Sequence, residues 1–404
     1  MENPKIRFKG FTKDWEQRKF GEVVEKYEDP VETPTEGYMR LGIRSHAKGT
    51  FHNYVEKGKE LETAKMFRVA ADKFIVNITF GWEHAVAITD KNDAGKLVSH
   101  RFPQYSFNEG MIPKFFRYLI LDESFKHHLE LSSPGGAGRN RVLKLNEMLE
   151  YKMSFPSEEE QKKIASYFEK LDHLITLHQR KCDQTKNLKK YMLQKMFPQN
   201  GAKVPEIRFD GYTYDWEQRK LGDLVNRITR KNQDLVSELP LTISAQYGLI
   251  DQNEFFDKRV ASKDVSGYYL IENGEFAYNK STSTDAPWGA IKRLDRYENG
   301  VLSTLYIVFG IKENNLVDSD FLVSYYSTNL WHKGIHEIAA EGARNHGLLN
   351  IAPADFFETK LMIPQDIEEQ KKIGKYFEEL DHLITLHQRQ TDFYKKTSFY
   401  FISS

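Results

Sequence analysis

The sequence contains a single cysteine, Cys182, among 404 residues. It therefore offers neither a disulfide framework nor the set of thiols that a cysteine zinc site needs. It also lacks a net charge, since 58 acidic residues balance 58 basic ones. Any nucleic-acid binding must then depend on local groups of cations, because the chain has no overall positive field.

Long apolar runs are missing as well. No stretch of 18 apolar residues occurs, and the opening residues MENPKIRFKGF lack the apolar core of a signal peptide. We therefore expect a cytoplasmic protein with no membrane partner. Hydrophobic residues make up 40% of the chain and aromatic residues 13%. This composition supports folded cores, and the length predicts at least two domains.

Recognisable catalytic motifs are the third absence. The sequence has no Gly-x-x-x-x-Gly-Lys-Ser/Thr phosphate loop and no Asn/Asp-Pro-Pro-Tyr/Phe methyltransferase motif. His173 and His178 are five residues apart, as are His382 and His387, which is not the spacing of two ligands on one helix face. We expect no catalytic residue, no metal site and no cofactor in this chain.

The sequence does contain a long internal repeat. Residues 4–19, PKIRFKGFTKDWEQRK, match residues 205–220, PEIRFDGYTYDWEQRK, at 12 of 16 positions. Residues 160–180 match residues 369–389 at 18 of 21 positions, including the shared phrase LDHLITLHQR. A period of about 200 residues is far longer than that of a solenoid repeat. Each copy is therefore a unit of domain size.

The segments between these blocks have diverged. Phe20–Phe155 and Leu221–Ile363 share only scattered positions, among them Asn77 and Asn279. Short β-type runs such as DKFIVNITFG, GEFAYNK and TLYIVFGI alternate with turns, and helical stretches follow at residues 111–132 and 318–339. This mixture predicts an α+β or α/β fold present twice, with two different surfaces.

The second repeated block reads as a long helix. Ser157 and Glu160, and likewise Asp366 and Glu369, have the spacing of a capping box at its start. Apolar residues then follow at intervals of four, three and four, a coiled-coil seam. The predicted seam is Ile164, Phe168, Leu171, Ile175, Ile373, Phe377, Leu380 and Ile384. The first helix is expected to end near Phe197, which gives it a length of roughly 60 Å.

Two interpretations of these helices remain open. Each helix could lie on its own domain, or the two could pack on each other and hold the variable domains apart. The identity extends to positions expected on the exposed side: Asp172, Thr176, Gln179 and Arg180. Packing alone does not require this, so we expect the same outer surface to be presented twice, to two copies of one partner.

The arrangement resembles the specificity subunit of Type I restriction–modification enzymes. The resemblance rests on Pro-x-Ile-Arg-Phe…Trp-Glu-Gln-Arg-Lys-x-Gly at residues 4–21 and 205–222, and on Pro…Glu-Gln-Lys-Lys-Ile at residues 156–164 and 364–373. Each short motif is moderately specific, but their duplicated order covers nearly the whole chain and is highly specific.

The resemblance implies an α+β chain of two tandem α/β target recognition domains, separated by long helices that form an antiparallel coiled coil with a pseudo-twofold repeat. We expect the first recognition domain at 1–156, the first helix at 157–200, the second recognition domain at 201–364 and the last helix at 365–404. Each domain would bind one half of a bipartite asymmetric site on double-stranded DNA, and the coiled coil would set the spacing.

The resemblance also implies partners. Two modification (methyltransferase) subunits would dock on the repeated regions, and restriction (motor-nuclease) subunits would join them. The complex would have adenine-methyltransferase and ATP-dependent endonuclease activity, whereas this chain would not be an enzyme. S-adenosylmethionine, ATP and Mg would belong to the partner subunits.

The end of the second copy departs from the first. Residues 188–197, LKKYMLQKMF, have no clear match in residues 392–404, DFYKKTSFYFISS. We expect the second helix to lack the closing turns of the first.

Candidate DNA contacts are polar loops near the shared positions, because Arg and Lys bind phosphates and guanine while Asn and Gln bind adenine. Matched loops would contact phosphates in both domains, and unmatched residues such as His46 and Gln246 would read bases. The tryptophans Trp15, Trp82, Trp216 and Trp288 are expected to pack. The candidates are Arg44, His46, Lys48, Arg139, Asn140, Arg141, Ser244, Gln246, Tyr247, Lys280, Ser281, Thr282, Arg344, Asn345 and His346.

Two other classes of function stay open at this point. The paired domains could form a non-catalytic protein-interaction scaffold, or an inactive or truncated variant of a specificity subunit. An enzyme with an unrecognised active site would instead show turnover without partners.

Overall fold

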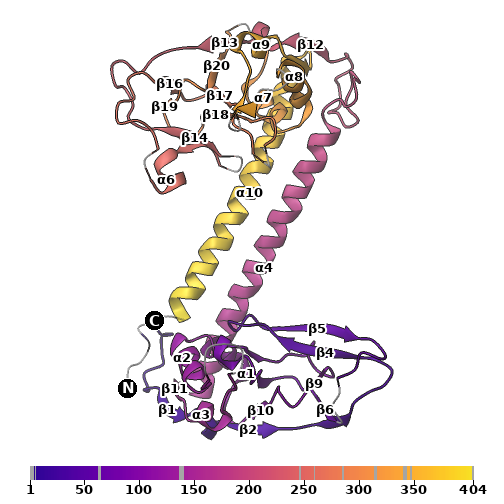
Figure 1. The fold of residues 1–404 in the computed structure, drawn as a ribbon, viewed down its shortest axis with the longest axis vertical. Coiled ribbons are helices and arrows are strands. Elements are labelled where there is room, and N and C mark those ends of the chain that lie inside the picture. Colours follow the sequence, from indigo (N-terminus) through magenta and orange to yellow (C-terminus); the bar gives the residue numbers. More distant parts are fainter. Residues whose placement is uncertain are drawn as a thin grey trace. The chain divides into compact units, whose positions relative to one another are not determined.

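A computed structural model describes residues 4, 6–61, 65–135, 141–244, 247–258, 260–283, 286–313, 316–339, 344–345 and 348–402 (Figure 1). For residues 344, 345 and 399–402 it describes the backbone alone. The chain forms two compact units. Unit 1 comprises Met1–Gln179 and Arg389–Ser404, and unit 2 comprises Arg180–Gln388. None of the described helices is both long and apolar enough to span a membrane.

Unit 1 contains most of the first copy of the repeat. Its elements are β1 (Glu16–Lys19), η1 (Phe20–Glu22), β2 (Val24–Tyr27), β3 (Pro30–Glu32), β4 (Tyr38–Ile43), β5 (Thr50–Val55), β6 (Lys65–Arg68), β7 (Lys73–Val76), η2 (Gly81–Glu83), β8 (Val86–Ile88), β9 (Leu97–Val98), β10 (Gln104–Phe107), α1 (Pro113–Leu119), α2 (Glu123–Leu131), α3 (Leu145–Leu149), β11 (Lys152–Phe155) and the first part of α4 (Glu158–Lys195).

Unit 2 contains the end of α4 and most of the second copy. Its elements are β12 (Glu217–Lys220), α5 (Leu221–Leu224), β13 (Val225–Ile228), β14 (Leu241–Ser244), β15 (Gly248–Asp251), α6 (Gln252–Phe256), β16 (Tyr269–Glu272), β17 (Phe276–Asn279), β18 (Ala290–Arg293), β19 (Asn299–Leu302), β20 (Ile307–Ile311), α7 (Ser319–Tyr325), α8 (Leu330–Ile338), β21 (Arg344–Asn345), β22 (Leu348–Leu349), α9 (Pro353–Glu358), β23 (Lys360–Ile363) and the first part of α10 (Ile367–Ile402).

Each unit has an inner antiparallel sheet of the same order. Unit 1 has β2-β10-β7-β8 and unit 2 has β13-β20-β17-β18. A second antiparallel pair, β1 with β11 or β12 with β23, joins the repeated block WEQRK to the strand that precedes the long helix. The predicted α+β fold class and the internal repeat are confirmed.

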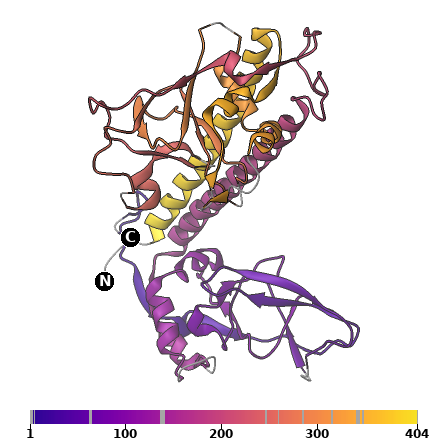
Figure 2. The same cartoon turned by 45° about the horizontal axis from the view of Figure 1, so that its top comes forward.

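The outer strands differ between the units. Unit 1 has a five-stranded sheet, β3-β6-β9-β4-β5, whereas unit 2 has separate pairs, β14 with β15 and β16 with β19. Figures 1 and 2 show the hairpin β4–β5 extending away from α1, α2 and α3 within unit 1. The divergence of the variable segments is therefore concentrated in these outer parts.

The predicted helical stretches are each broken into two. Residues 111–132 form α1 and α2, and residues 318–339 form α7 and α8. Asp318 caps α7 by accepting hydrogen bonds from the backbone N–H groups of Asp320 and Phe321 at 3.0 and 2.9 Å. The break lies at a similar place in both copies, so it belongs to the shared fold.

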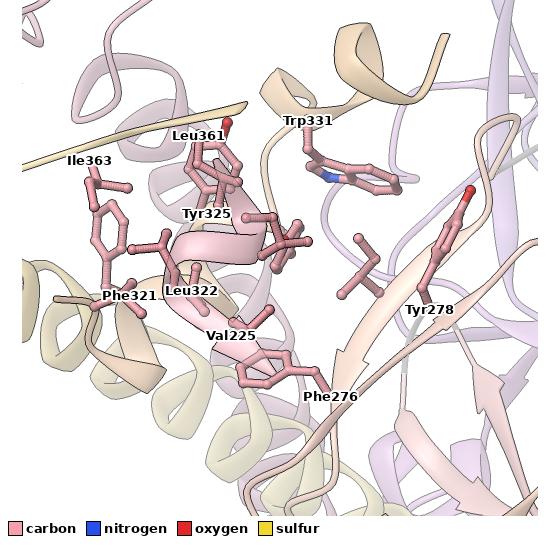
Figure 3. Close-up of a cluster of buried hydrophobic side chains, with 14 of the residues drawn as sticks. Val225, Phe276, Tyr278, Phe321, Leu322, Tyr325, Trp331, Leu361 and Ile363 are labelled. Carbon is pink, nitrogen blue, oxygen red and sulfur yellow. The ribbon is translucent and has the colours of Figure 1, made fainter. Parts of the chain in front are cut away.

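The largest core lies in unit 2, between the inner sheet and the helices. Phe276 stacks on Phe309 with ring centroids 5.4 Å apart, and Tyr278 stacks on Phe356 at 4.9 Å. Figure 3 shows Phe276 and Tyr278 of β17 facing the cluster around Phe321 and Tyr325 of α7. Burial of such aromatic rings stabilises each by a few kcal/mol at roughly 25 cal/mol per Å².

The two repeated blocks bind each other through buried ion pairs. Arg7 donates to both carboxylate oxygens of Glu160, at 2.7 and 2.8 Å, and Arg208 does the same to Glu369. Both carboxylates have side chains only 1% exposed. The predicted role of Glu160 and Glu369 in capping boxes is therefore wrong, because a bidentate guanidinium is the stronger partner. Asp366 does cap α10, through the Glu368 N–H at 2.8 Å.

The residue after each glutamate fastens the long helix to its recognition fold. Gln161 accepts from the Ile112 N–H at 3.0 Å and donates to the Pro156 carbonyl at 2.9 Å. Gln370 accepts from the Asp318 N–H at 2.9 Å and donates to the Pro364 carbonyl at 2.9 Å. Much of the identity of these blocks is thus explained by buried hydrogen bonding.

The long helices pair within each unit and also contact the recognition folds. In unit 2, Lys189 of α4 forms an ion pair with Asp381 of α10 at 2.6 Å, and Cys182 lies 3.9 Å from the Ile384 carbonyl, an antiparallel order. In unit 1, Tyr394 of α10 stacks on His178 of α4 with ring centroids 5.7 Å apart. The structure therefore combines the two interpretations that the sequence left open: the long helices contact each other, and each also lies on a recognition fold.

The predicted seam residues also contact both the other long helix and the recognition folds. Phe168 and Leu171 are buried with Tyr118 of α1, and the half-buried Tyr394 of α10 packs against them. Ile373, Phe377 and Leu380 belong to the core of unit 2. Ile164, Ile175 and Ile384 are half-buried. The seam thus serves the helix pair and the recognition folds together.

The helix ends differ from expectation. α4 ends at Lys195, two residues before the predicted end, and Asn200 and Gly201 then adopt left-handed φ values of 53° and 81°. α10 continues through the divergent tail to Ile402. The expectation that the second helix lacks closing turns is wrong as far as Ile402.

The predicted domain limits at 156, 200 and 364 stay predictions, since the two units divide within α4 and α10.

Candidate nucleic-acid interface

The same asparagine turn ends the central strand of the inner sheet in both units. Asn77 follows β7, and its side-chain oxygen accepts the Thr79 N–H at 3.0 Å. Asn279 ends β17, and its side-chain oxygen accepts the Ser281 N–H at 3.0 Å. An Asx turn of this kind fixes the direction in which the following loop leaves the strand. Each unit therefore presents a variable loop from an equivalent position.

In unit 1 the predicted loop Arg44–Lys48 packs against the loop that follows Asn77. The His46 N–H donates to the Glu83 carbonyl at 2.8 Å, and the Ser45 hydroxyl donates to the Glu83 carboxylate. His46 and Ala47 adopt positive φ values of 60° and 49°, an uncommon conformation for residues with a Cβ. The side chains of His46 and Lys48 are exposed.

Arg141 reaches the same place from a distant part of the sequence. Its guanidinium lies 5.4 Å from the ring centroid of Trp82, and it stands 3.9 Å from the Glu130 carboxylate. Trp82 belongs to η2, next to the residue that holds the Arg44–Lys48 loop. The structure thus gathers two predicted cationic loops around Trp82 and Glu83.

Arg44 is partly engaged by its own hairpin. Its guanidinium donates to the Thr50 carbonyl and lies 5.4 Å from the Phe51 ring. Gly42 permits this packing, because a Cβ there would stand 2.3 Å from the Phe51 ring. Arg44 remains exposed and is held in one direction, which suits a residue that positions a phosphate.

Sequence reasoning missed Arg101 in this cluster. Arg101 is exposed, and its carbonyl accepts the Ile78 N–H at 3.0 Å, directly after the asparagine turn. No periodic pattern marks it, and only the pairing of its loop with residue 78 brings it to the site.

In unit 2 the loop after Asn279 packs against the hairpin β21–β22. The Lys280 carbonyl accepts the Leu349 N–H at 3.0 Å, and Ser281 forms an isolated bridge with Leu348. This places Lys280 and Ser281 beside β22, the strand that pairs with Arg344 and Asn345. Partial burial lowers the pKa of the Lys280 ammonium below its ordinary value of 10.5. A cation already partly dehydrated loses less hydration when it binds a phosphate.

The third predicted loop of unit 2 connects to this site through Tyr306. The Tyr306 hydroxyl accepts a hydrogen bond from the Asn279 side-chain amide at 3.3 Å. It is also hydrogen-bonded to Thr242 of β14. Ser244 ends β14 and is 7% exposed, and its hydroxyl accepts the Tyr247 N–H at 3.3 Å. Ser244 therefore shapes the turn, whereas Tyr247 is 56% exposed and free to stack or hydrogen-bond outward.

The remaining predicted contacts are only partly placed. Thr282 lies in the loop after Ser281 and is half-buried. Arg344 and Asn345 form β21, with their backbone alone described. The predictions at Arg139, Asn140, Gln246 and His346 lie outside the described residues. Trp216 is 1% exposed, and Trp15, Trp82 and Trp288 are half-buried, as the expectation that they pack requires.

The chemistry of these loops is that of a binding surface. Each unit has one aromatic side chain among its polar loops: the Arg141 guanidinium lies 5.4 Å from the Trp82 ring centroid in unit 1, and the Asn279 amide donates to the Tyr306 hydroxyl in unit 2. Among the described residues no group of three or more His, Cys, Asp or Glu side chains could hold a metal ion. Such loops can bind a phosphate backbone and read base edges.

Comparisons with known proteins agree with this arrangement. The model of the Type I restriction modification DNA specificity domain matches residues 12–187 and 214–392. No curated protein matches the sequence.

The fold is similar to that of solved structures. The S subunit of a Type I restriction–modification system from M. genitalium has a TM-score of 0.58 and 12% identity, covering 99% of this chain and 98% of its own. The HsdS subunit from Thermoanaerobacter tengcongensis has a TM-score of 0.47 and 16% identity, covering 96% of each chain.

Proposed function

Since this chain belongs to the Type I restriction–modification DNA specificity family and is a DNA sequence-recognition subunit, we propose that each unit reads one half of a bipartite asymmetric site. The resemblance of the sequence to that family is confirmed. The observation that supports separate reading is that both units end a central strand in the same asparagine turn, yet continue into unlike loops.

The proposed reading surface of unit 1 is the group Arg44, His46, Lys48, Arg101 and Arg141 around Trp82. That of unit 2 is Tyr247, Lys280, Ser281 and the hairpin that carries Arg344. Cations on both surfaces would hold phosphates and set the register, and the exposed unmatched side chains would read base edges in the major groove.

The further roles are also proposals. The paired helices α4 and α10 would fix the number of base pairs between the half-sites. Two modification subunits would dock on the repeated regions, restriction subunits would join them, and the assembly would act in the cytoplasm. Methyl transfer, ATP hydrolysis and cleavage, with their S-adenosylmethionine, ATP and Mg, would belong to those partners, and this chain would be non-catalytic.

Exchange of Phe20–Phe155 for the corresponding segment of another family member tests separate reading. In cells that carry the modification subunit, genome-wide methylation mapping should show one half-site changed and the other retained. A change in both halves would refute separate reading. The absence of sequence-selective methylation in cells that carry the native chain with the modification subunit would instead favour a scaffold or an inactive variant.

Insertion of seven residues into each long helix tests the spacing role. Seven residues add roughly 10 Å of helix, or about three base pairs at 3.4 Å each. The same methylation map should then show a longer spacer between unchanged half-sites. An unchanged spacer would refute the role of the helices as a ruler.

A further inference from the structure

The hairpin β4–β5, whose turn carries the loop Arg44–Lys48, directs one face into unit 1 (Figure 1). Leu41 and Ile43 of β4 are 0% and 7% exposed and belong to a buried cluster. On the same face of β5, the His52 ring nitrogen lies 2.8 Å from the buried Asp93 carboxylate. Because side chains alternate along a strand, the residues between these positions lie on the opposite, outward face.

The outward face begins beside the loop with an aromatic ring. Phe51 is paired with Gly42 across the two strands, and a Cβ at Gly42 would stand 2.3 Å from the Phe51 ring. The ring therefore lies across the backbone of β4, which only glycine permits. On its other side the Arg44 guanidinium lies 5.4 Å from the ring centroid. The reading surface of unit 1 thus continues from Arg44 onto the hairpin.

The next pair on the outward face is Arg40 and Asn53, which lie opposite each other. Arg40 is half-buried and Asn53 is exposed, and within the described part of the chain neither side chain has a hydrogen-bond or ion-pair partner. At the far end of the hairpin, by contrast, Lys57 is paired with Glu36 at 2.9 Å. The outward strip ends after Arg40, because Tyr38, the next residue on this face, is 6% exposed.

The shape and the chemistry of this strip fit the major groove of DNA. The groove is about 12 Å wide and admits a two-stranded ribbon, and Arg and Asn are the side chains that bind guanine and adenine edges through two hydrogen bonds. Successive residues on one face of a strand are about 6.8 Å apart, which corresponds to about two base pairs at 3.4 Å each.

The matching hairpin of unit 2 offers no such strip. Its strands β14 and β15 have four residues each, whereas β4 and β5 have six. Thr242, which matches Gly42 in the shared Leu-x-Ile sequence, is 7% exposed, and Ile250, which faces Thr242, is also 7% exposed. The face that is outward in unit 1 is therefore buried in unit 2.

We infer that the hairpin β4–β5 is a second specificity element of unit 1, whose outward face enters the major groove and reads further base pairs through Arg40 and Asn53. The half-site of unit 1 then extends about two base pairs beyond those that the loop Arg44–Lys48 contacts. Since unit 2 lacks such a strip, its half-site is the shorter one. The inference rests on the proposed function, to which it adds the longer half-site and the side chains that read its end.

Methylation mapping of the double variant Arg40→Ala/Asn53→Ala tests the inference, in cells that carry the modification subunit. For the native chain, the half-site that changes on exchange of Phe20–Phe155 should be the longer one. In the double variant, the positions at one end of this half-site should become degenerate, while the other half-site and the spacer stay unchanged. In binding competition with the assembled subunits, preference for the native base pair at that end should fall at least about fivefold, the discrimination of one bidentate contact.

Two single variants of the same hairpin are the matched controls. Lys57→Ala removes an equal charge at the paired end, and Tyr54→Ala removes a side chain that is 61% exposed on the other face. Both should retain the native methylation map. Damage to the hairpin fold would instead weaken binding to all sequences equally, and that result would overturn the inference.

The remaining outcomes separate this inference from the function on which it rests. A native map with two half-sites that the double variant leaves unchanged would overturn the role of the hairpin while separate reading stands. A longer half-site for unit 2, or equal degeneracy in Lys57→Ala, would also overturn it. A native chain that directs no selective methylation would overturn the proposed function and the inference together.

Discussion

The inner and outer sheets of the two units show opposite degrees of divergence. The inner sheets keep one strand order, and the Asn77 and Asn279 turns keep one hydrogen bond, although the segments around them share little sequence. The outer strands form a five-stranded sheet in unit 1 and two separate pairs in unit 2. The fold is thus maintained by burial and register, while the surfaces near the reading loops are free to change.

The largest expected effect is on the ion pairs common to both units. Replacement of Glu369 by Ala should destabilise unit 2 by roughly 3 kcal/mol, because Arg208 keeps its charge in a buried site. Glu160→Ala should cost somewhat less, since Glu369 alone also accepts from the Trp216 indole, at 3.3 Å. Denaturant unfolding of the purified chain measures both values.

The matched control is Glu16→Ala, another glutamate of the repeat. Its pair with Arg18 is on the surface, with the Glu16 side chain 61% exposed, so its removal should leave the unfolding midpoint almost unchanged. Equal losses for Glu16 and Glu369 would contradict the assignment of the buried pairs as the main link between the blocks.

The next largest effect is expected on DNA binding by the reading surface of unit 1. Arg141→Ala should weaken DNA binding by about 1–3 kcal/mol and reduce the salt dependence of the binding constant, because one phosphate or base contact is lost. Arg141→Lys keeps the charge but loses the planar contact with Trp82, so it should retain part of the affinity. Binding to DNA with altered half-sites should place the loss on the half read by unit 1.

A smaller effect is expected at the shared turns. Asn77→Ala and Asn279→Ala each remove one side-chain acceptor, worth about 1 kcal/mol. Asn279→Ala should disturb reading more, because Asn279 also donates to Tyr306 and so connects two loops. Competition assays with half-site variants measure the change in preference. A larger loss of preference for Asn77→Ala would contradict the role of Tyr306.

The smallest expected effect is a dependence on pH in unit 1. His84 is 3% exposed and its ring nitrogen donates to the Ile120 carbonyl at 2.8 Å, and burial lowers the pKa of the imidazole below 6.5. The unfolded chain then binds the proton more readily, so stability is full above pH 6.5 and falls as the pH drops below it. Thermal unfolding between pH 7.5 and 5.5 should show this loss in the native chain.

The variant His84→Asn serves as the reference for that measurement. Asparagine tolerates the left-handed φ of 59° at this position but does not titrate. Its unfolding should therefore depend less on pH in this range. An identical pH dependence in both chains would show that His84 does not carry the effect.

The sequence predicted the repeat, the long helices and the α+β class because each depends on local pattern or on identity between copies. It did not predict that Glu160 turns away from its own helix to Arg7, since the same spacing also suits a capping box. Nor did it reveal the break between α1 and α2, because apolar residues continue through Ile120.

The reading surface was predicted only in part for a similar reason. Arg141 and Trp82 are 59 positions apart, and Arg101 reaches the asparagine turn through a single backbone hydrogen bond. Contacts between irregular segments leave no periodic trace in one sequence. The loops could therefore be chosen by residue type, but their gathering around Trp82 and Tyr306 required the fold.

The short pairs β1–β11 and β12–β23 have a consequence for inheritance. Glu16 faces Phe155, and Glu217 faces Ile363, so each variable segment leaves and re-enters the repeated framework between neighbouring strands. Facing residues in such a ladder are only about 5 Å apart. A foreign segment whose ends meet at that distance can replace the resident one if it also keeps the contacts with the long helix, such as those made by Gln161 and Gln370. Recombination between related genes at these two borders would then create a new recognition specificity in one step, as a cassette exchange.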